Sequence, residues 1–125
     1  MWGLTASASP DGYSGHKPGQ DDNGTIGTTA AVSAFLYAPQ ASMQSLETMY
    51  REYGKRLWQE VGPCHAFNPS KDWFYKSHLG IDTGTIAPML ENYRSGLLWK
   101  LFMGAPEIKA ALRKLENAQP GITNK

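Results

Sequence analysis

The chain has 125 residues, the size of a single domain, and a formal net charge of +1. Because lysine and arginine are scattered and their excess is so small, neither a nucleic-acid nor a membrane-surface partner is indicated. The single cysteine, Cys64, excludes a disulfide within the chain and a zinc site of the cysteine type. No apolar run is long enough for a membrane span, and residues 1–25 are too polar and glycine-rich for a secretory signal.

Residues 1–26 are predicted to be irregular in structure. Pro10-Asp11-Gly12 and Asn23-Gly24 favour turns, because glycine and asparagine accept a positive φ. A loop of this length in a compact domain is usually either functional or disordered. Since disordered segments contain few aromatic residues, Trp2, Tyr13 and His16 favour an ordered and functional loop.

Apolar residues at intervals of three and four predict a helical protein of the all-α class. The third predicted helix is apolar on almost every side, which is typical of the inner layer of a multi-helix fold. Thr85 is expected to be its N-cap, and Pro88 is tolerated because it lies in the first turn. The four predicted helices span residues 25–36, 39–58, 86–103 and 106–117, with a second aromatic-rich loop over residues 59–84 and a frayed tail over residues 119–125.

One sequence pattern occurs twice, 60 residues apart. Asp22-Asn-Gly-Thr-Ile26 and Asp82-Thr-Gly-Thr-Ile86 share Asp-x-Gly-Thr-Ile, and each follows a long loop and precedes an apolar helix. Each apolar helix is followed by an amphipathic helix that begins at or near Ala-Pro, so the order of loop, inner helix and outer helix is repeated. Two such hairpins cannot close a core by themselves, since repeat architectures need neighbours on both sides. The chain is therefore predicted to be an incomplete helical assembly with exposed apolar surface.

Asp82 is the acid best placed for chemistry. It lies in the predicted loop just before the most apolar helix, between Gly80 and Gly84, which leave room for a ligand to approach the backbone. The alternative for an Asp-x-Gly sequence is that the carboxylate caps its own turn. His16 and His65 have no third metal ligand at a telling spacing, so both are expected to form hydrogen bonds, and neither a metal nor another cofactor is predicted.

Six motifs follow one another along the chain: Trp2-Gly-Leu-Thr-Ala-Ser7, Pro10-Asp-Gly-Tyr13, Asp22-Asn-Gly-Thr-Ile26, Ala66-Phe-Asn68, Leu79-Gly-Ile-Asp82 and Glu91-Asn-Tyr-Arg-Ser-Gly-Leu-Leu-Trp99. In this order they resemble the C-terminal part of the bacterial glucoamylase-like (glycoamylase) family, which includes endo-β-1,2-glucanases. The resemblance implies an (α/α) toroid of six helical hairpins, with an active-site cleft built from loops at one mouth. Residues 1–118 would then be the C-terminal segment, about the last third, of such a catalytic domain.

The sequence departs from the family pattern at three places. Cys64-His65 stands where the family often has Tyr-Asp, which puts any role of that acid in doubt. Asp82-Thr-Gly-Thr stands where the family has Asp-Gln-Gly-Pro, so only the aspartate and the glycine carry over, and Thr28 stands where proline is common. Glu91 and Arg94 belong to a motif that does match, and because they are three residues apart on one helix they are expected to pair.

The resemblance implies a glycoside hydrolase that acts on a β-glucan, and the expected linkage is β-1,2. Such enzymes need one carboxyl group that donates a proton and one carboxylate that acts on the other face of the bond. Asp82 is the predicted catalytic carboxylate, and the general acid is expected upstream of this chain. Phe67 and Phe74 are expected to cover helix ends. The predicted substrate-binding residues are Trp2, Tyr13, His16, Asp22, Asn23, Asn68 and Trp73.

Two alternatives stay open from the sequence. One is the transglycosylating glucoamylase-like domain of a cyclic β-1,2-glucan synthase, and the other is a non-catalytic remnant that binds carbohydrate. The expected partners are an oligosaccharide or polysaccharide and either the rest of the toroid or a second copy of the chain. The expected location, by resemblance, is periplasmic or extracellular, and the isolated chain is expected to be inactive because half of the acid/base pair is missing.

Overall fold

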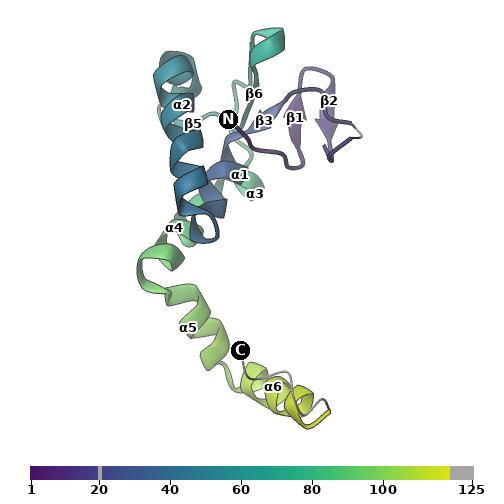
Figure 1. Cartoon of the computed structure of the whole chain (residues 1–125), viewed down its shortest axis with the longest axis vertical. Coiled ribbons are helices and arrows are strands. Elements are labelled where there is room, and N and C mark those ends of the chain that lie inside the picture. Colours follow the sequence, from purple (N-terminus) through teal and green to yellow (C-terminus); the bar gives the residue numbers. More distant parts are fainter. Residues whose placement is uncertain (20, 119–125) are drawn as a thin grey trace.

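The computed structural model describes residues 1–19 and 21–118, so the tail expected over residues 119–125 lies outside the described residues. Short strands and turns occupy much of the first 85 residues, and helices occupy the rest (Figure 1). The elements are, in chain order, β1 (Ser7–Ser9), β2 (Gly12–Ser14), β3 (Ile26–Gly27), α1 (Thr28–Ser33), η1 (Ala34–Leu36), α2 (Pro39–Leu57), β4 (Trp58–Gln59), β5 (Gly62–Pro63), β6 (Ala66–Asn68), η2 (Pro69–Lys71), β7 (Trp73–Phe74), α3 (Gly80–Thr83), α4 (Ile86–Ser95), α5 (Leu97–Gly104) and α6 (Pro106–Ala118).

The two segments predicted to be loops contain short antiparallel strands, which corrects the all-α expectation. β1 pairs with β2, with Ala8 opposite Tyr13, and the turn between them contains Gly12 at a φ of 109°. A second sheet has the order β3-β6-β7, with Phe67 opposite both Ile26 and Phe74. A third pairing joins β4 to β5. The protein is therefore mainly helical, with small sheets that tie the loops together.

Only the second and fourth predicted helices have nearly the predicted bounds. The first predicted helix begins at Thr28 rather than Thr25, because Ile26 and Gly27 pair with β6 as a strand. Its last turn is the 3₁₀ helix η1. The third is broken in two at Gly96, whose left-handed φ of 68° ends α4 and begins α5.

The hydrophobic core lies between α1, α2 and the sheet of β6 and β7. Ala31, Met49, Leu57, Cys64 and Phe67 form its buried cluster. The rings of Phe67 and Phe74 stack with their centroids 5.6 Å apart, and the Arg56 guanidinium lies 4.0 Å from the Phe74 ring. Phe67 and Phe74 thus hold the sheet against α2, in agreement with the structural role predicted for them.

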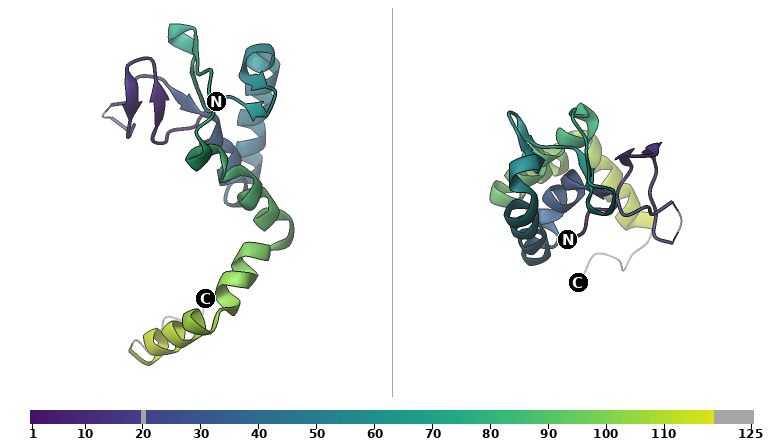
Figure 2. Two further views of the ribbon diagram at one scale, coloured as in Figure 1. Left: turned by 180° about the vertical axis from the view of Figure 1, so that it is seen from behind. Right: turned by 90° about the horizontal axis from the view of Figure 1, so that it is seen from above.

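The helices after Gly96 extend away from the rest of the molecule. We call residues 1–95 the body and α5 with α6 the arm. Figure 1 and the left view of Figure 2 show the arm leading away from the body. α4 packs against the rest of the body, where the rings of Phe35 and Tyr93 meet edge to face with their centroids 4.9 Å apart. No residue of α5 or α6 is buried in the described part of the chain, so the prediction of a helix buried on all sides is wrong for this chain, whereas the predicted exposed apolar surface is present.

None of the helices in residues 1–19 and 21–118 combines the length and the apolar character needed to cross a bilayer.

Candidate functional site: a buried His–Asp pair beside a polar hollow

Asp82 lies inside the short helix α3, not in a loop before a long helix as predicted. The backbone N–H groups of Asp82 and Thr83 donate to the carbonyl of Leu79 at 3.0 and 2.9 Å, and the Thr83 hydroxyl donates to the same oxygen at 3.0 Å. The Asp82 side chain is 17% exposed. This arrangement fixes the backbone of the carboxylate and leaves part of its side chain in contact with solvent.

One carboxylate oxygen of Asp82 faces His65. His65 is fully buried, and its Nδ1 lies 3.2 Å from Oδ2 of Asp82. The two atoms do not form a well-aligned hydrogen bond, and neither has another polar partner within the described residues. On the other side of the ring, Nε2 accepts a hydrogen bond from the backbone N–H of Ala8 at 3.1 Å.

The environment of His65 favours the neutral ring. Burial lowers the pKa of His65 below its ordinary value of 6.5, although the Asp82 carboxylate acts in the opposite direction and His78 adds a smaller lowering effect. The ring also meets Tyr75 edge to face at 5.6 Å. His65 therefore accepts one hydrogen bond, from Ala8, and the pair with Asp82 consists of a neutral imidazole and a carboxyl group.

A polar hollow of about 380 Å³ lies beside the β1–β2 hairpin, and three of the predicted binding residues line it. β1 connects the hollow to the His–Asp pair, because Ala8 donates to His65 while the next residue, Ser9, faces the hollow. Within the described residues, no three His, Cys, Asp or Glu side chains gather in a way that could hold a metal ion. The lining residues are Ser9, Asp11, Ser14, His16, Asp21, Asp22 and Asn23.

Asp11 is the best-connected carboxylate of the polar hollow. Its Oδ2 accepts from Lys71 Nζ at 2.8 Å and from Asn23 Nδ2 at 3.0 Å. The hydrogen bond from Lys71, and then the one from Asn23, hold the pKa of Asp11 below its ordinary value. The carboxylate is therefore ionised at neutral pH and links the hairpin to η2.

His16 lines the hollow and has one ring nitrogen without a polar partner among the described residues. The residue is 5% exposed, and its Nδ1 lies 2.8 Å from the carbonyl oxygen of Asp21. Since a carbonyl only accepts, Nδ1 carries the proton and Nε2 of the neutral ring is an acceptor. Nε2 is buried and has no polar partner within the described part of the chain. Nε2 is therefore shielded from the hollow in this arrangement of the side chains.

Asn68 supports the hollow without facing it. Asn68 is fully buried, and its amide donates to the carbonyl of Asn23 at 2.9 Å and lies 3.2 Å from the hydroxyl of Thr25. Its Oδ1 accepts from Ser70 Oγ and from the backbone N–H of Lys71. The side chain of Asn68 is thus engaged within the chain and holds the loops around the hollow together, while its predicted contact with substrate stays a prediction.

The two copies of the Asp-x-Gly-Thr-Ile pattern fold differently. Asp22 Oδ1 accepts from the backbone N–H of Gly24 at 3.1 Å, and Gly24 has a left-handed φ of 78°. In the second copy Gly84 has a right-handed φ of −63°, and the carboxylate of Asp82 turns toward His65 instead of its own turn. A carboxylate that caps its own turn, the alternative considered for Asp82 from the sequence, is therefore found at Asp22 and not at Asp82.

The predicted aromatic residues are spread over the body. Tyr13 lies on β2 and is 61% exposed. Trp2 lines a second hollow of about 430 Å³ together with Asp22, while its indole N–H donates to the carbonyl of Ala41 at 3.2 Å. Trp73 lies on β7 in a shallow hollow that also contains Arg56 and Asp72, outside the polar hollow. The structure brings His16, Asp22 and Asn23 together, places Trp2 next to Asp22, and leaves Trp73 apart.

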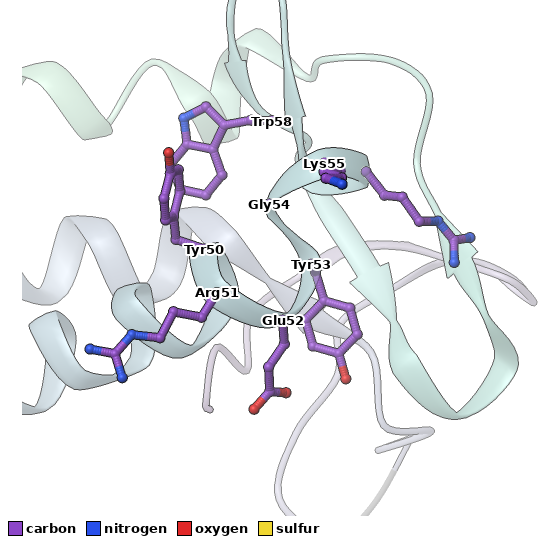
Figure 3. A pocket seen from close by; sticks show the side chains of 8 residues that line it. Tyr50, Arg51, Glu52, Tyr53, Gly54, Lys55 and Trp58 are labelled. Atoms are coloured by element: carbon purple, nitrogen blue, oxygen red, sulfur yellow. The ribbon is translucent and has the colours of Figure 1, made fainter.

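A hollow of about 790 Å³ wraps the last turns of α2 and contains no predicted site residue. Figure 3 shows its lining side chains diverging from the helix rather than converging on one point. Tyr50 and Trp58 pack edge to face at 5.4 Å on one side of it. Its shape is that of an exposed helix surface, so it is not a candidate for chemistry.

Several residues of this region were missed at the level of sequence. Ser9, Asp11 and Ser14 line the hollow because they lie on the β1–β2 hairpin, and Lys71 of η2 bonds to Asp11. The Pro10-Asp11-Gly12 turn was recognised, but a turn sequence does not indicate what its aspartate contacts. For His65, the available signal was its departure from the Tyr-Asp pair of the family pattern.

A helical chain whose loops gather hydroxyl, amide and carboxylate groups around a polar hollow has the features of a polyhydroxyl-binding domain. The family model of Glycoamylase, described as "Putative glucoamylase", matches residues 1–106, and the chain belongs to this family.

Three of the similar proteins are named for β-1,2-linked glucans. The chain is 39% identical over 117 residues to the exo beta-1,2-glucooligosaccharide sophorohydrolase (non-reducing end) of Parabacteroides distasonis, covering 93% of this chain and 16% of that protein. Among solved structures, the endo-beta-1,2-glucanase of Chitinophaga pinensis, in a complex with sophorotriose and glucose, is 46% identical with a TM-score of 0.86, covering 91% of this chain and 28% of that one. The beta-1,2-glucanase of Parabacteroides distasonis is 39% identical with a TM-score of 0.86, covering 93% of this chain and 17% of that one. The chain thus spans between about a sixth and just over a quarter of the length of these relatives.

Proposed function

We propose that this chain supplies part of the substrate cleft and one catalytic carboxylate, Asp82, of a glycoside hydrolase that acts on a β-1,2-linked glucan. Membership of the Glycoamylase family and the names of the relatives support the reaction and the substrate. The observation that carries the assignment of Asp82 is its geometry: a partly exposed carboxylate on a fixed backbone, with one oxygen turned to a buried imidazole.

The role proposed for Asp82 is that of the base or nucleophile. Hydrolysis of a glycosidic bond needs a second carboxyl group, which protonates the leaving oxygen from the other side of the bond. We expect that group in the part of a longer family domain that this chain does not span. Asp82 then acts on water or on the sugar with the oxygen that does not face His65.

The polar hollow is proposed to bind sugar hydroxyl groups. The carboxylates of Asp11 and Asp22 accept hydrogen bonds from hydroxyls, Asn23 can both donate and accept them, and His16 lines the same hollow. Trp2 and Tyr13 offer exposed aromatic faces nearby, which suit the apolar faces of a pyranose. Trp73 is proposed as a contact only for a longer glucan, since it lies outside this hollow.

The exposed arm supports the proposal that residues 1–118 are the C-terminal segment of an (α/α) toroid. Leu101 and Phe102 of α5 are 64% and 60% exposed, and side chains of this size are normally buried against a neighbour. The occupant we propose is the remainder of the toroid, and the isolated chain is expected to associate with itself through this face. We also propose a periplasmic or extracellular location, which cell fractionation of the producing bacterium would test.

The test of the function is hydrolysis of a linear β-1,2-glucan by the full-length product of the gene that encodes this chain. Asp82→Asn is expected to lower kcat by about 10²- to 10⁴-fold, the range of a general acid or base. Glu47→Gln is the control, because Glu47 is an exposed carboxylate on α2 that pairs with Arg51 and lines none of the hollows described above. Near-parent activity of Asp82→Asn would contradict the assignment.

The products separate the competing functions. Glucose or short β-1,2-linked oligosaccharides indicate hydrolysis, whereas longer or cyclic transfer products would favour the synthase domain. Binding of the glucan without turnover by the unmodified protein would favour a carbohydrate-binding remnant.

A further inference from the structure

We propose that His65 is a positioning residue for Asp82: a neutral imidazole, locked as the Nδ1–H tautomer by the backbone of β1, that fixes the orientation of the carboxylate. The proposal rests on the proposed function only where it gives Asp82 a part in the reaction. The tautomer and its contact with Asp82 are properties of the chain itself and can be measured without any substrate.

The tautomer follows from the contact on Nε2. The backbone N–H of Ala8 lies 3.1 Å from Nε2, and a backbone N–H can only donate. Nε2 must therefore present its lone pair, and the single proton of the neutral ring is on Nδ1. Ala8 is held in place because it pairs with Tyr13 across the hairpin, so the donor cannot turn away.

A doubly protonated ring does not fit this position. A proton on Nε2 would point at the N–H of Ala8, and the fully buried side chain has no access to water that could accept it instead. The titratable groups facing the ring are Asp82 and His78, with Tyr75 at its edge. Burial outweighs the attraction of the Asp82 carboxylate and lowers the pKa of His65, in agreement with a neutral ring.

The contact between Nδ1 of His65 and Asp82 is the basis of the proposed positioning role. Oδ2 of Asp82 is buried at 3.2 Å from Nδ1, and it has no other polar partner within the described residues. A buried carboxylate oxygen without a donor is unfavourable, and a small rotation of either side chain would align the N–H with it. When Oδ2 is held against His65, the rest of the partly exposed carboxylate must face the other way, toward the solvent side of α3.

The test compares three substitutions in the full-length gene product. The amide of His65→Asn can place an N–H near the position of Nδ1, whereas the amide of His65→Gln reaches the position of Nε2, and His65→Leu has no donor. We expect kcat to fall on the order of 10- to 100-fold in His65→Gln and His65→Leu, the effect of an unpaired buried carboxylate oxygen, with KM unchanged. His65→Asn should keep kcat within about fivefold, because a donor to Oδ2 remains.

The pH profile separates positioning from a general loss of stability. Without the N–H donor, the charged form of the carboxylate is less favoured, so the acid limb of kcat should move to higher pH in His65→Leu and not in His65→Asn. Equal losses in all three variants, with unmoved pH profiles, would overturn the proposal. If Asp82→Asn is inactive while His65→Gln and His65→Leu match the parent, the proposal fails and the proposed function survives.

A direct measurement keeps the proposal falsifiable even if the variants do not fold. In the unmodified protein, two-bond ¹⁵N–¹H correlation spectra should show a protonated Nδ1 and an unprotonated Nε2 on His65 throughout the pH range in which an ordinary histidine of pKa near 6.5 titrates. A proton on Nε2, or titration of His65 near that ordinary value, would overturn it. If Asp82→Asn proves fully active but the spectra show the Nδ1–H tautomer, the proposed function fails and the His–Asp pair stands as a structural contact.

Discussion

The body and the arm of this chain are both rich in apolar residues, but only the body buries them. Met49, Leu57 and Phe67 are fully buried in the body. In the arm, α5 is the most apolar helix of the chain and yet contains no buried residue. The sequence therefore specifies which side chains are apolar, and the arrangement of neighbouring segments decides which of them are buried.

The hydrogen bonds show the same difference. In the body they join distant parts of the chain: Trp2 with Ser45, Ala8 with His65, and Lys71 with Asp11. In the arm, those formed by described side chains are local, such as Lys100 with the carbonyl of Ser95. One aromatic contact joins the arm to a distant segment of the body: the rings of Tyr37 and Trp99 meet at a tilt with their centroids 6.4 Å apart. A helix with so few long-range contacts depends mainly on its local propensity and its own backbone bonds. The arm thus has the structure expected of a segment whose packing partners lie outside this chain.

A pair of aromatic truncations should give the largest difference between the two regions. Phe67→Ala is expected to lower the free energy of unfolding by about 3–5 kcal/mol, because it opens a cavity in the core of the body. Phe102→Ala, a chemically identical change at a 60% exposed position, should alter it by less than about 0.5 kcal/mol. Urea unfolding of the isolated chain, followed by circular dichroism, measures both changes in the free energy of unfolding. Sedimentation of the isolated chain should show weaker self-association in Phe102→Ala. Equal destabilisation by the two changes would mean that α5 is buried in solution.

Cys64 provides a chemical probe of the body alone. Burial raises the pKa of the Cys64 thiol from 9.0 to about 11, so the folded protein should hold about a hundredfold less thiolate than an exposed cysteine at pH 8. The neutral thiol is favoured in the folded state, so this contribution to stability is complete below pH 9.0 and is lost as the pH rises through about 11.

Alkylation of Cys64 with iodoacetamide measures this effect. The reaction should be slow in the folded protein, should accelerate in urea, and should be accelerated by Phe67→Ala but not by Phe102→Ala. Rapid alkylation of the unmodified protein in buffer would show that the body opens readily.

The smallest expected effect concerns the junction between the body and the arm. Gly96 has a φ of 68°, and the nearest atom to an added Cβ, Cε of Lys100, would be 3.6 Å away, so backbone strain is the main effect of a side chain there. Gly96→Ala is expected to reduce helix stability by about 1 kcal/mol. Gly104→Ala is the matched control, because Gly104 ends α5 without a positive φ, and that change should be neutral or stabilising by up to about 1 kcal/mol. Thermal unfolding by circular dichroism distinguishes the two, and identical effects would contradict the left-handed junction.

The exposed pair of Glu91 and Arg94 shows what local sequence can establish. Two hydrogen bonds of 2.9 Å join the two side chains, as their spacing predicts. The bonds to Arg94, and then to Ser95, hold the pKa of Glu91 below its ordinary value, while the interaction with Glu91 raises the pKa of Arg94. Both groups face solvent, so the pair is a feature of the helix surface.

The sequence by itself determined the features that depend on neighbours a few residues apart. The bounds of α2 and α6, the turns at Gly12 and Gly24, and the Glu91–Arg94 pair were all predictable, because helix periodicity, turn chemistry and pairing at a spacing of three are local. The family resemblance also followed from motifs in their order along the chain.

Tertiary structure alone decided the rest. The strand pairing of Phe67 with Ile26, the contact of His65 with Asp82 and the different folds of the two Asp-x-Gly-Thr-Ile patterns require segments far apart in sequence to meet. The exposure of α5 was decided in the same way, since an apolar helix is buried only where other segments pack against it. Periodicity specifies the apolar face of a helix, but the position of its neighbours is a property of the whole fold.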